Sequence, residues 1–158
     1  MKENSYKIIE TVQLSHTKIE LRDDGIIQFF HKDNFQFTMR EIKEMEEIVL
    51  RITKGITHKS LIVAGAFSNV DLEVMKHLSS TEGALVSLAD AFVIHSLSQK
   101  LLTNFYLKIN KPVLPTKIFN KINEAEEWLQ SLNNEELQTI HKRKIVQLKS
   151  IKTKEVAF

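Results

Sequence analysis

Alternation of polar and apolar residues marks the first part of this chain. Residues 17–21 alternate strictly, and an apolar run follows at residues 26–30. Asp24-Gly25 lies between the two runs, and glycine accepts a positive φ angle without steric penalty, which is typical of a tight hairpin turn. We therefore predict an antiparallel hairpin over residues 17–30. A shorter alternating run follows at residues 35–37.

A helical spacing of apolar residues begins after this hairpin. Four of them recur every three or four positions and so share one face of a helix. They are Ile42, Met45, Val49 and Ile52. Thr38 and Glu41 form a capping box, in which the hydroxyl and the carboxylate each accept a hydrogen bond from a free amide at the helix start. With Gly55 as a typical C-terminal stop, these signals predict a helix from about residue 39 to 54.

The second half of the chain alternates short apolar runs with helical patterns. The runs at residues 61–64 and 92–94 are continuous, which is typical of strands buried on both faces, and residues 115–119 are a candidate last strand. A polar residue that can accept hydrogen bonds from free amides opens the helix after each run. These candidate caps are Asn69 or Asp71, Ser96 or Ser98, and Asn120 or Asn123. Strands alternating with helices predict right-handed crossovers and a largely parallel sheet.

These patterns together predict an α/β fold with a mixed sheet: an N-terminal hairpin, then strand-helix alternation, with helices packed on the sheet. We divide the chain into an N-terminal extension or edge strand at residues 1–16, one domain at residues 17–132, and a tail at residues 133–158. The tail is basic and is either helical, from Glu135 to Lys149, or partly disordered. A chain of 158 residues fits a single domain with one core.

The charge and composition of the chain exclude several classes of function. The chain has no cysteine, which excludes disulfides, thiolate catalysis and cysteine-based zinc sites. Residues 131–158 carry six basic and three acidic side chains, and since the whole chain has a net charge of +2, the remaining residues carry −1. The basic character belongs to the tail, so no nucleic-acid surface is expected. The N-terminus lacks a signal-peptide core and no apolar stretch reaches the length of a membrane span, so we expect a cytoplasmic protein.

The order of these elements resembles the SpoIIAA-like, or STAS-like, domain family, and within it a small uncharacterised bacterial group described as STAS/SEC14-like. The resemblance runs from the hairpin around Asp24-Gly25 to the helix that ends near Trp128-Leu129, or roughly residues 17 to 132. It implies a mixed sheet flanked by helices on one side. It also implies a non-enzymatic protein-interaction or regulatory domain that binds a partner protein, as anti-sigma-factor antagonists bind a kinase.

Two functional features of that family bear on this chain. The resemblance implies a phosphorylated serine at the start of the helix after the central strand, in an Asp-Ser-Ser-Gly-like motif. Here the matching residues 64–71 read AGAFSNVD, so the motif is missing and Ser68 is the nearest serine. We therefore do not transfer the phosphorylation switch. The related lipid-binding branch implies an apolar cleft, and the alternative function is a module that binds a small apolar or anionic molecule.

Polar side chains follow the predicted strands at their carboxyl ends, where open α/β sheets bind ligands. The candidate ligand or anion site consists of Ser68, Asn69, His95, Ser96 and Ser98. Free amides at the helix starts there favour an anion. The alternative interpretation is structural: the serines and Asn69 cap helices, and His95 only leaves a buried strand. The chain lacks a Gly-x-Ser-x-Gly turn and histidine pairs at helical spacing, so we predict no catalytic residue, no metal site and no cofactor.

Consecutive aromatic residues mark the helix that follows residue 98. Phe105, Tyr106 and Leu107 cannot all face its buried side, because neighbours on a helix point about 100° apart. An outward aromatic can form an apolar patch for a protein partner or for a second copy of the chain in a homodimer. The other interpretation is a helix buried on two sides. Our leading prediction is a non-enzymatic, partner-binding domain with Phe105 and Tyr106 at its interface.

Overall fold

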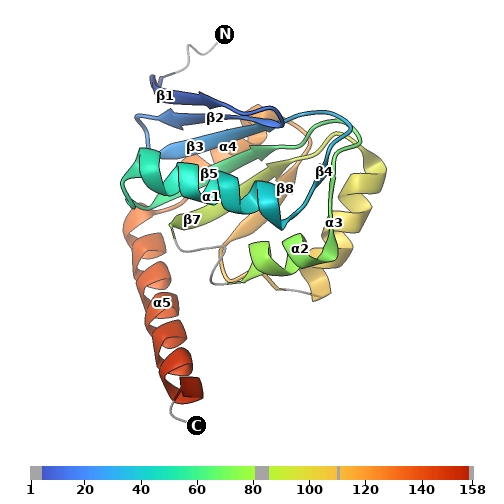
Figure 1. The fold of residues 1–158 in the computed structure, drawn as a ribbon. Helices are drawn as coiled ribbons and strands as arrows, with labels where there is room; N and C mark the ends of the chain where they lie inside the picture. The colour runs from blue at the N-terminus through green and yellow to red at the C-terminus, as the bar shows by residue number, and fades with distance from the viewer. Residues whose placement is uncertain (1–4, 81–85, 110, 157–158) are drawn as a thin grey trace.

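A six-stranded mixed sheet forms the centre of the protein (Figure 1). The structure is a computed structural model and describes residues 5–80, 86–109 and 111–156. The strands lie in the order β1-β2-β3-β5-β7-β8. Their bounds are β1 Ile8–Gln13, β2 Thr17–Arg22, β3 Ile26–His31, β5 His58–Val63, β7 Ser87–Val93 and β8 Thr116–Phe119. The first three strands pair antiparallel and β3, β5, β7 and β8 pair parallel, which confirms the predicted mixed α/β sheet.

Helices cover both faces of this sheet. In Figure 1, α1 and α2 lie in front of the sheet and α4 lies behind it, while α5 extends away below. The bounds are α1 Met39–Thr53, α2 Leu72–Ser79, α3 Leu97–Ile109, α4 Ile122–Ser131 and α5 Asn134–Val156. The one-sided arrangement that the family resemblance implied is therefore wrong for this chain. The continuous apolar runs of β5 and β7 explain the difference, because such strands bury side chains on both faces.

Two separate hydrophobic clusters result from this two-sided packing. The cluster on the α4 side contains Leu61, Ala91, Val93 and Leu129, together with Leu137 from α5. The cluster on the α1 side joins the antiparallel strands to α1 and α2, through residues that include Ile19, Ile27, Met45, Val49 and Val74. Ile26 and Ile27, which are adjacent in β3, lie in different clusters, as the two-residue period of a strand requires.

Several predicted caps agree with the structure and others do not. The capping box of Thr38 and Glu41 is present at the start of α1. Asp71 caps α2, since its carboxylate accepts from the amide of Val74 at 3.0 Å, whereas Asn69 lies in the short strand β6, Asn69–Val70, which pairs with β4, Gln36–Phe37. The predicted Asn caps of α4 are wrong, because Lys121 occupies the N-cap and makes no side-chain cap bond. Asn120 lies one residue before this N-cap position and Asn123 lies two residues after it.

The two central strands begin earlier than the apolar pattern predicts. β5 starts at His58 rather than Leu61, and β7 starts at Ser87 rather than Phe92. The added residues are partly polar, but in the fold His58, Lys59, Ser60 and Ser87 are buried. An apolar pattern cannot detect strand residues of this kind, and three of the four, His58, Ser60 and Ser87, line the proposed site described below.

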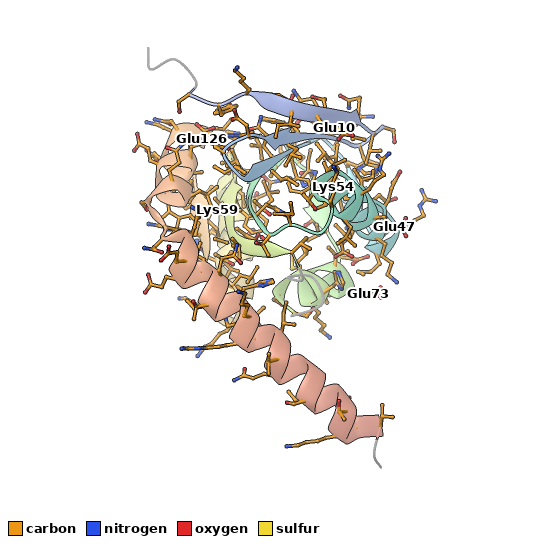
Figure 2. All side chains as sticks on the ribbon, turned by 90° about the vertical axis from the view of Figure 1, so that its left-hand side faces the viewer. Glu10, Glu47, Lys54, Lys59, Glu73 and Glu126 are labelled. Carbon is orange, nitrogen blue, oxygen red and sulfur yellow. The ribbon has the colours of Figure 1, made fainter. Side chains whose placement is uncertain are left out.

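Both ends of the chain take regular structure. Ile8–Gln13 forms the edge strand β1, and the tail forms the long helix α5, which begins beside the sheet and continues away from the domain (Figures 1 and 2). Leu137 and His141 in the first part of α5 are buried. The division of the chain at residues 16 and 132 stays a prediction. In the part of the chain that the structure describes, none of the helices is long and apolar enough to cross a membrane.

Candidate ligand-binding pocket

A pocket of about 310 Å³ lies between the sheet and the helices α1, α2 and α3. Strand alternation builds its floor, because every second residue of β5 and β7 faces this side. These residues are His58, Ser60 and Ile62 of β5, and Asp90 and Phe92 of β7, with Ala64 and Ile94 just beyond the strand ends. We call it the α1-side pocket.

Most of the pocket wall is apolar. Aromatic rings and flexible or branched aliphatic side chains come from every surrounding element, including Phe29, Phe37, Met45, Val49, Met75 and Leu107. Ligand sites in proteins are typically concave and mostly apolar, with a few polar groups that fix the orientation of the bound molecule. The α1-side pocket fits that description in both size and composition.

One group of polar side chains lies at the amino ends of β5 and β7. The hydroxyl of Ser87 donates to Oδ1 of Asp90 at 2.7 Å, and Oγ of Ser60 lies 3.1 Å from Oγ of Ser87. The register of the parallel strands produces this contact, since Ser60 is paired with Asp90 and His58 with Ser87. We call His58, Ser60, Ser87 and Asp90 the polar cluster.

Burial favours the uncharged forms of the titratable groups in the polar cluster. It raises the pKa of Asp90 above its usual 3.8, against the opposing effect of the serine hydrogen bonds, and so favours the protonated acid. It lowers the pKa of His58 to about 4, against the opposing effect of a hydrogen bond with the backbone of Ile56, so this imidazole is neutral at physiological pH. Nδ1 of His58 is buried and has no hydrogen-bond partner among the described residues. The cluster therefore offers an acid whose neutral form is favoured, two hydroxyls and one unpaired imidazole nitrogen.

A second polar feature reaches the pocket at His31, on the last residue of β3. Nδ1 of His31 lies 2.8 Å from the hydroxyl of Thr17, which lies 2.9 Å from Nδ1 of His16, and Nε2 of His16 lies 3.1 Å from Glu44. Burial lowers the pKa of His31 to about 4, and the neighbouring His16 contributes in the same direction. The chain of contacts fixes the His31 ring and satisfies one of its nitrogens, so His31 is held as a rigid, neutral wall residue.

Two of the residues predicted from the sequence line the pocket. Ser68 is buried and its hydroxyl donates to the carbonyl of Gly65 at 2.8 Å, while the side chain of Asn69 accepts from the amide of Val70 at 2.9 Å. Gln99 of α3 donates to the carbonyl of Ser68 at 2.6 Å and so ties this loop to α3. Both predicted side chains are thus occupied by local hydrogen bonds.

The other predicted residues do not line the pocket. His95 is exposed, and among the described residues no hydrogen bond joins it to Ser96 or Ser98. Ser96 accepts from the amide of Gln99 at 3.4 Å, as a cap does, and its hydroxyl lies 2.8 Å from that of Ser98. An anion site at these residues stays a prediction. The side chains of Phe105 and Tyr106 lie outside the described residues, so the interface assigned to them also stays a prediction.

The sequence prediction missed the polar cluster. A partial signal was present, because His58 and Ser60 lie two positions apart, as in a strand that continues into Leu61. Ser87 and Asp90 lie three positions apart, and they share a face because of a register irregularity between β5 and β7. That pairing depends on the alignment of β5 with β7, which the sequence does not state. In the described part of the chain, no group of three His, Asp or Glu side chains is arranged to hold a metal ion.

Comparison with known proteins identifies the family. The profile of a domain of unknown function, DUF7793, matches residues 19–133, which is most of the chain. The protein belongs to the DUF7793 family. The match spans the sheet from β2 to β8 with its helices and therefore includes the whole α1-side pocket. None of the curated proteins compared with the chain matches it.

A solved structure supports the fold of this DUF7793 member. The chain is similar to an uncharacterised protein of the DUF3478 family with a SpoIIAA-like fold from Shewanella loihica PV-4, with a TM-score of 0.50 and 16% sequence identity. The similarity covers 82% of this chain and 98% of the other. At this identity the likeness shows the fold alone, which is SpoIIAA-like as the element order predicted.

Proposed function

We propose that this DUF7793 domain binds a small, largely apolar molecule in the α1-side pocket. The observation that carries the proposal is the pocket of about 310 Å³ in the middle of the domain, walled by the sheet and three helices. Protein interiors normally pack with few voids larger than a water molecule. A space of this size, lined by aromatic and aliphatic side chains, suits an occupant of similar polarity.

Binding rather than catalysis is the function that the pocket chemistry favours. His31 and His58 are weak bases, because burial lowers the pKa of each to about 4. Burial raises the pKa of Asp90 and so favours its neutral form, which is a poor base. A serine nucleophile needs a base that accepts its proton, whereas Ser87 donates its hydroxyl hydrogen bond to Asp90. We therefore propose a non-enzymatic binding domain.

A pocket-filling substitution tests the proposal. The fluorescence of N-phenyl-1-naphthylamine, a neutral apolar dye, should rise on binding to the wild-type protein. Ile62→Trp places a large ring in the pocket and should weaken dye binding at least tenfold. Ile56→Trp is the matched control, since Ile56 is exposed and is not part of the pocket wall. Native mass spectrometry of gently purified protein should also detect a retained small molecule.

Two results would contradict the ligand proposal. The first is a wild-type protein that neither binds the dye nor retains any molecule. The second is equal dye binding by the Ile62→Trp and Ile56→Trp variants, with both shown to be folded by circular dichroism, because this would place the dye outside the pocket.

A second candidate function, self-association, is favoured by a different surface. Phe67, 78% exposed, lies in the loop after β5, and Leu97 and Leu101, 73% and 63% exposed, lie in the first two turns of α3. The hydrogen bonds of Gln99 to Gly65 and Ser68 bring this loop and this helix together. Exposed apolar groups of this kind are typical of protein interfaces. Sedimentation should then show a wild-type dimer and a Phe67→Asp monomer, and a wild-type monomer at high concentration would contradict it.

A further inference from the structure

We infer that the molecule bound in the α1-side pocket is uncharged and carries one hydrogen-bonding group, such as a hydroxyl, which pairs with the polar cluster of His58, Ser60, Ser87 and Asp90. The inference rests on the proposed function and specifies the chemical class of the ligand. Three observations carry it: an unpaired buried nitrogen, a chain of polar groups beside it, and the charges that face the pocket.

The unpaired nitrogen belongs to His58. This side chain is 4% exposed and lines the pocket, and its Nδ1 has no hydrogen-bond partner among the described residues. Buried polar atoms in folded proteins are almost always paired, because an unpaired one loses its hydrogen bond to water without replacement. Other buried polar side chains of the domain, such as Lys59 and Arg22, do have partners. The exception at a pocket wall indicates a contact with a bound molecule.

The chain of polar groups runs from Ser60 through Ser87 to Asp90. Its oxygen–oxygen distances are 3.1 Å between the two hydroxyls and 2.7 Å between Ser87 and Asp90. Asp90 lines the pocket and retains some accessible surface. The carboxyl group of Asp90 accepts hydrogen bonds, and its protonated form, which burial favours, also donates one. The cluster can therefore satisfy the donor and the acceptor of a single hydroxyl on the ligand.

The charges around the pocket exclude an ionised head group. No lysine or arginine is among the described residues that line the pocket. The lining carboxylate of Glu46 already contacts Nε2 of His77. A carboxylate or phosphate on the ligand would be buried without a counter-charge, next to the acid of Asp90. Burial of an unpaired ion is far more costly than burial of a hydrogen-bonded hydroxyl, so the pocket selects the neutral group.

Four molecules with the same apolar part test this selection: butylbenzene, 4-phenylbutan-1-ol, 5-phenylpentanoate and 4-phenylbutylamine. Each is titrated at pH 7.5 against wild-type protein loaded with N-phenyl-1-naphthylamine, and displacement of the dye is measured. The alcohol should bind at least tenfold more tightly than the carboxylate and the amine. Butylbenzene should also displace the dye, because it shares the apolar contacts.

Variants of Asp90 then separate the head group from the apolar part. Asp90→Leu should weaken binding of the alcohol five- to tenfold and leave butylbenzene unchanged or tighter. Asp90→Asn keeps a donor and an acceptor and should retain most of the affinity for the alcohol. Thermal unfolding of each variant verifies that it is folded, and Asp90→Asn provides a close substitute if Asp90→Leu does not fold.

The outcomes distinguish this inference from the proposed function. If the dye does not bind the wild-type protein, the proposed function fails and the inference with it. If the dye binds but the carboxylate or the amine displaces it as well as the alcohol does, the inference is overturned and the proposed function stands. The same holds if Asp90→Leu affects the alcohol and butylbenzene equally, or if none of the four molecules displaces the dye.

Discussion

Two adjacent buried polar side chains, which point to opposite faces of the central sheet, differ in their pairing. On the α4 face, the ammonium of Lys59 donates to the carbonyls of Leu129 and Leu132 at 2.6 and 3.1 Å, at the C-terminal end of α4 (Figure 2). On the α1 face, the neighbouring residue His58 lines a pocket and leaves a nitrogen unpaired. Adjacent residues of one strand thus differ in role: Lys59 joins a helix to the sheet, and His58 is available to a ligand.

Arg22 shows how complete the pairing on the α4 face is. Its guanidinium is fully buried and donates to Asp24 at 2.5 Å and to Glu126 of α4 at 2.6 Å, and the ring of Tyr6 lies 3.3 Å from its central carbon. The pair with Glu126 joins residues 104 positions apart in the sequence. Fully paired buried groups of this kind stabilise the architecture, and the unpaired nitrogen of His58 is where we place the contact with a ligand.

The largest expected effect concerns Arg22. Arg22→Leu should lower the free energy of unfolding by about 3–5 kcal/mol, because it leaves the partly buried carboxylates of Asp24 and Glu126 without their cation. Urea denaturation measures the loss. Arg40→Leu is the matched control, since Arg40 is exposed and should change stability by less than about 0.5 kcal/mol. A similar small change for both variants would show that the α4 face does not depend on its ion pairs.

Lowering the pH should destabilise the protein, because two histidines that line the pocket are neutral in the folded state. His31 and His58 are neutral when folded, since burial lowers each pKa from 6.5 to about 4. The unfolded chain takes up these protons below pH 6.5, so stability falls as the pH decreases toward 4. The loss is about 2 kcal/mol for each histidine between pH 7 and pH 5. Urea denaturation at both pH values measures the free energy of unfolding, and between pH 7 and pH 5 His58→Leu should lose about 2 kcal/mol less of it than the wild type does. Equal losses in the two proteins would mean that His58 is charged in the folded state.

The smallest expected effect is a difference in the free energy of unfolding between substitutions at two neighbouring residues of β5. Leu61 is fully buried in the α4-side cluster, whereas Ile62 lines the pocket. Leu61→Ala should cost about 3 kcal/mol, because it opens a cavity in a packed region. Ile62→Ala should cost roughly 1.5 kcal/mol, since it enlarges a space that already exists and loses mainly the transfer term. Thermal denaturation compares the two, and equal costs would indicate that both faces are equally well packed.

The elements that the sequence predicted well have complete local signals. The hairpin at Asp24-Gly25 has a glycine at a φ of 81°, and α1 has its capping box and a left-handed C-terminal residue, Lys54, directly before Gly55. Each signal acts within a few residues of the chain. The start of α4 was mispredicted for the same reason, because Lys121 offers no capping side chain that a local pattern could detect.

The order and type of the main elements, and the burial of β5 and β7 on both faces, could be predicted from the sequence. Apolar spacing and caps act between near neighbours, so one chain segment contains the whole signal. The burial and pairing of the polar residues, by contrast, depend on how distant segments pack together. Ser60 meets Asp90 through the register of two strands, and Lys59 meets α4 through the packing of a helix some 70 residues away. The pocket and its polar cluster exist only once these distant segments are aligned, because hydrogen bonding and desolvation depend on what surrounds a side chain.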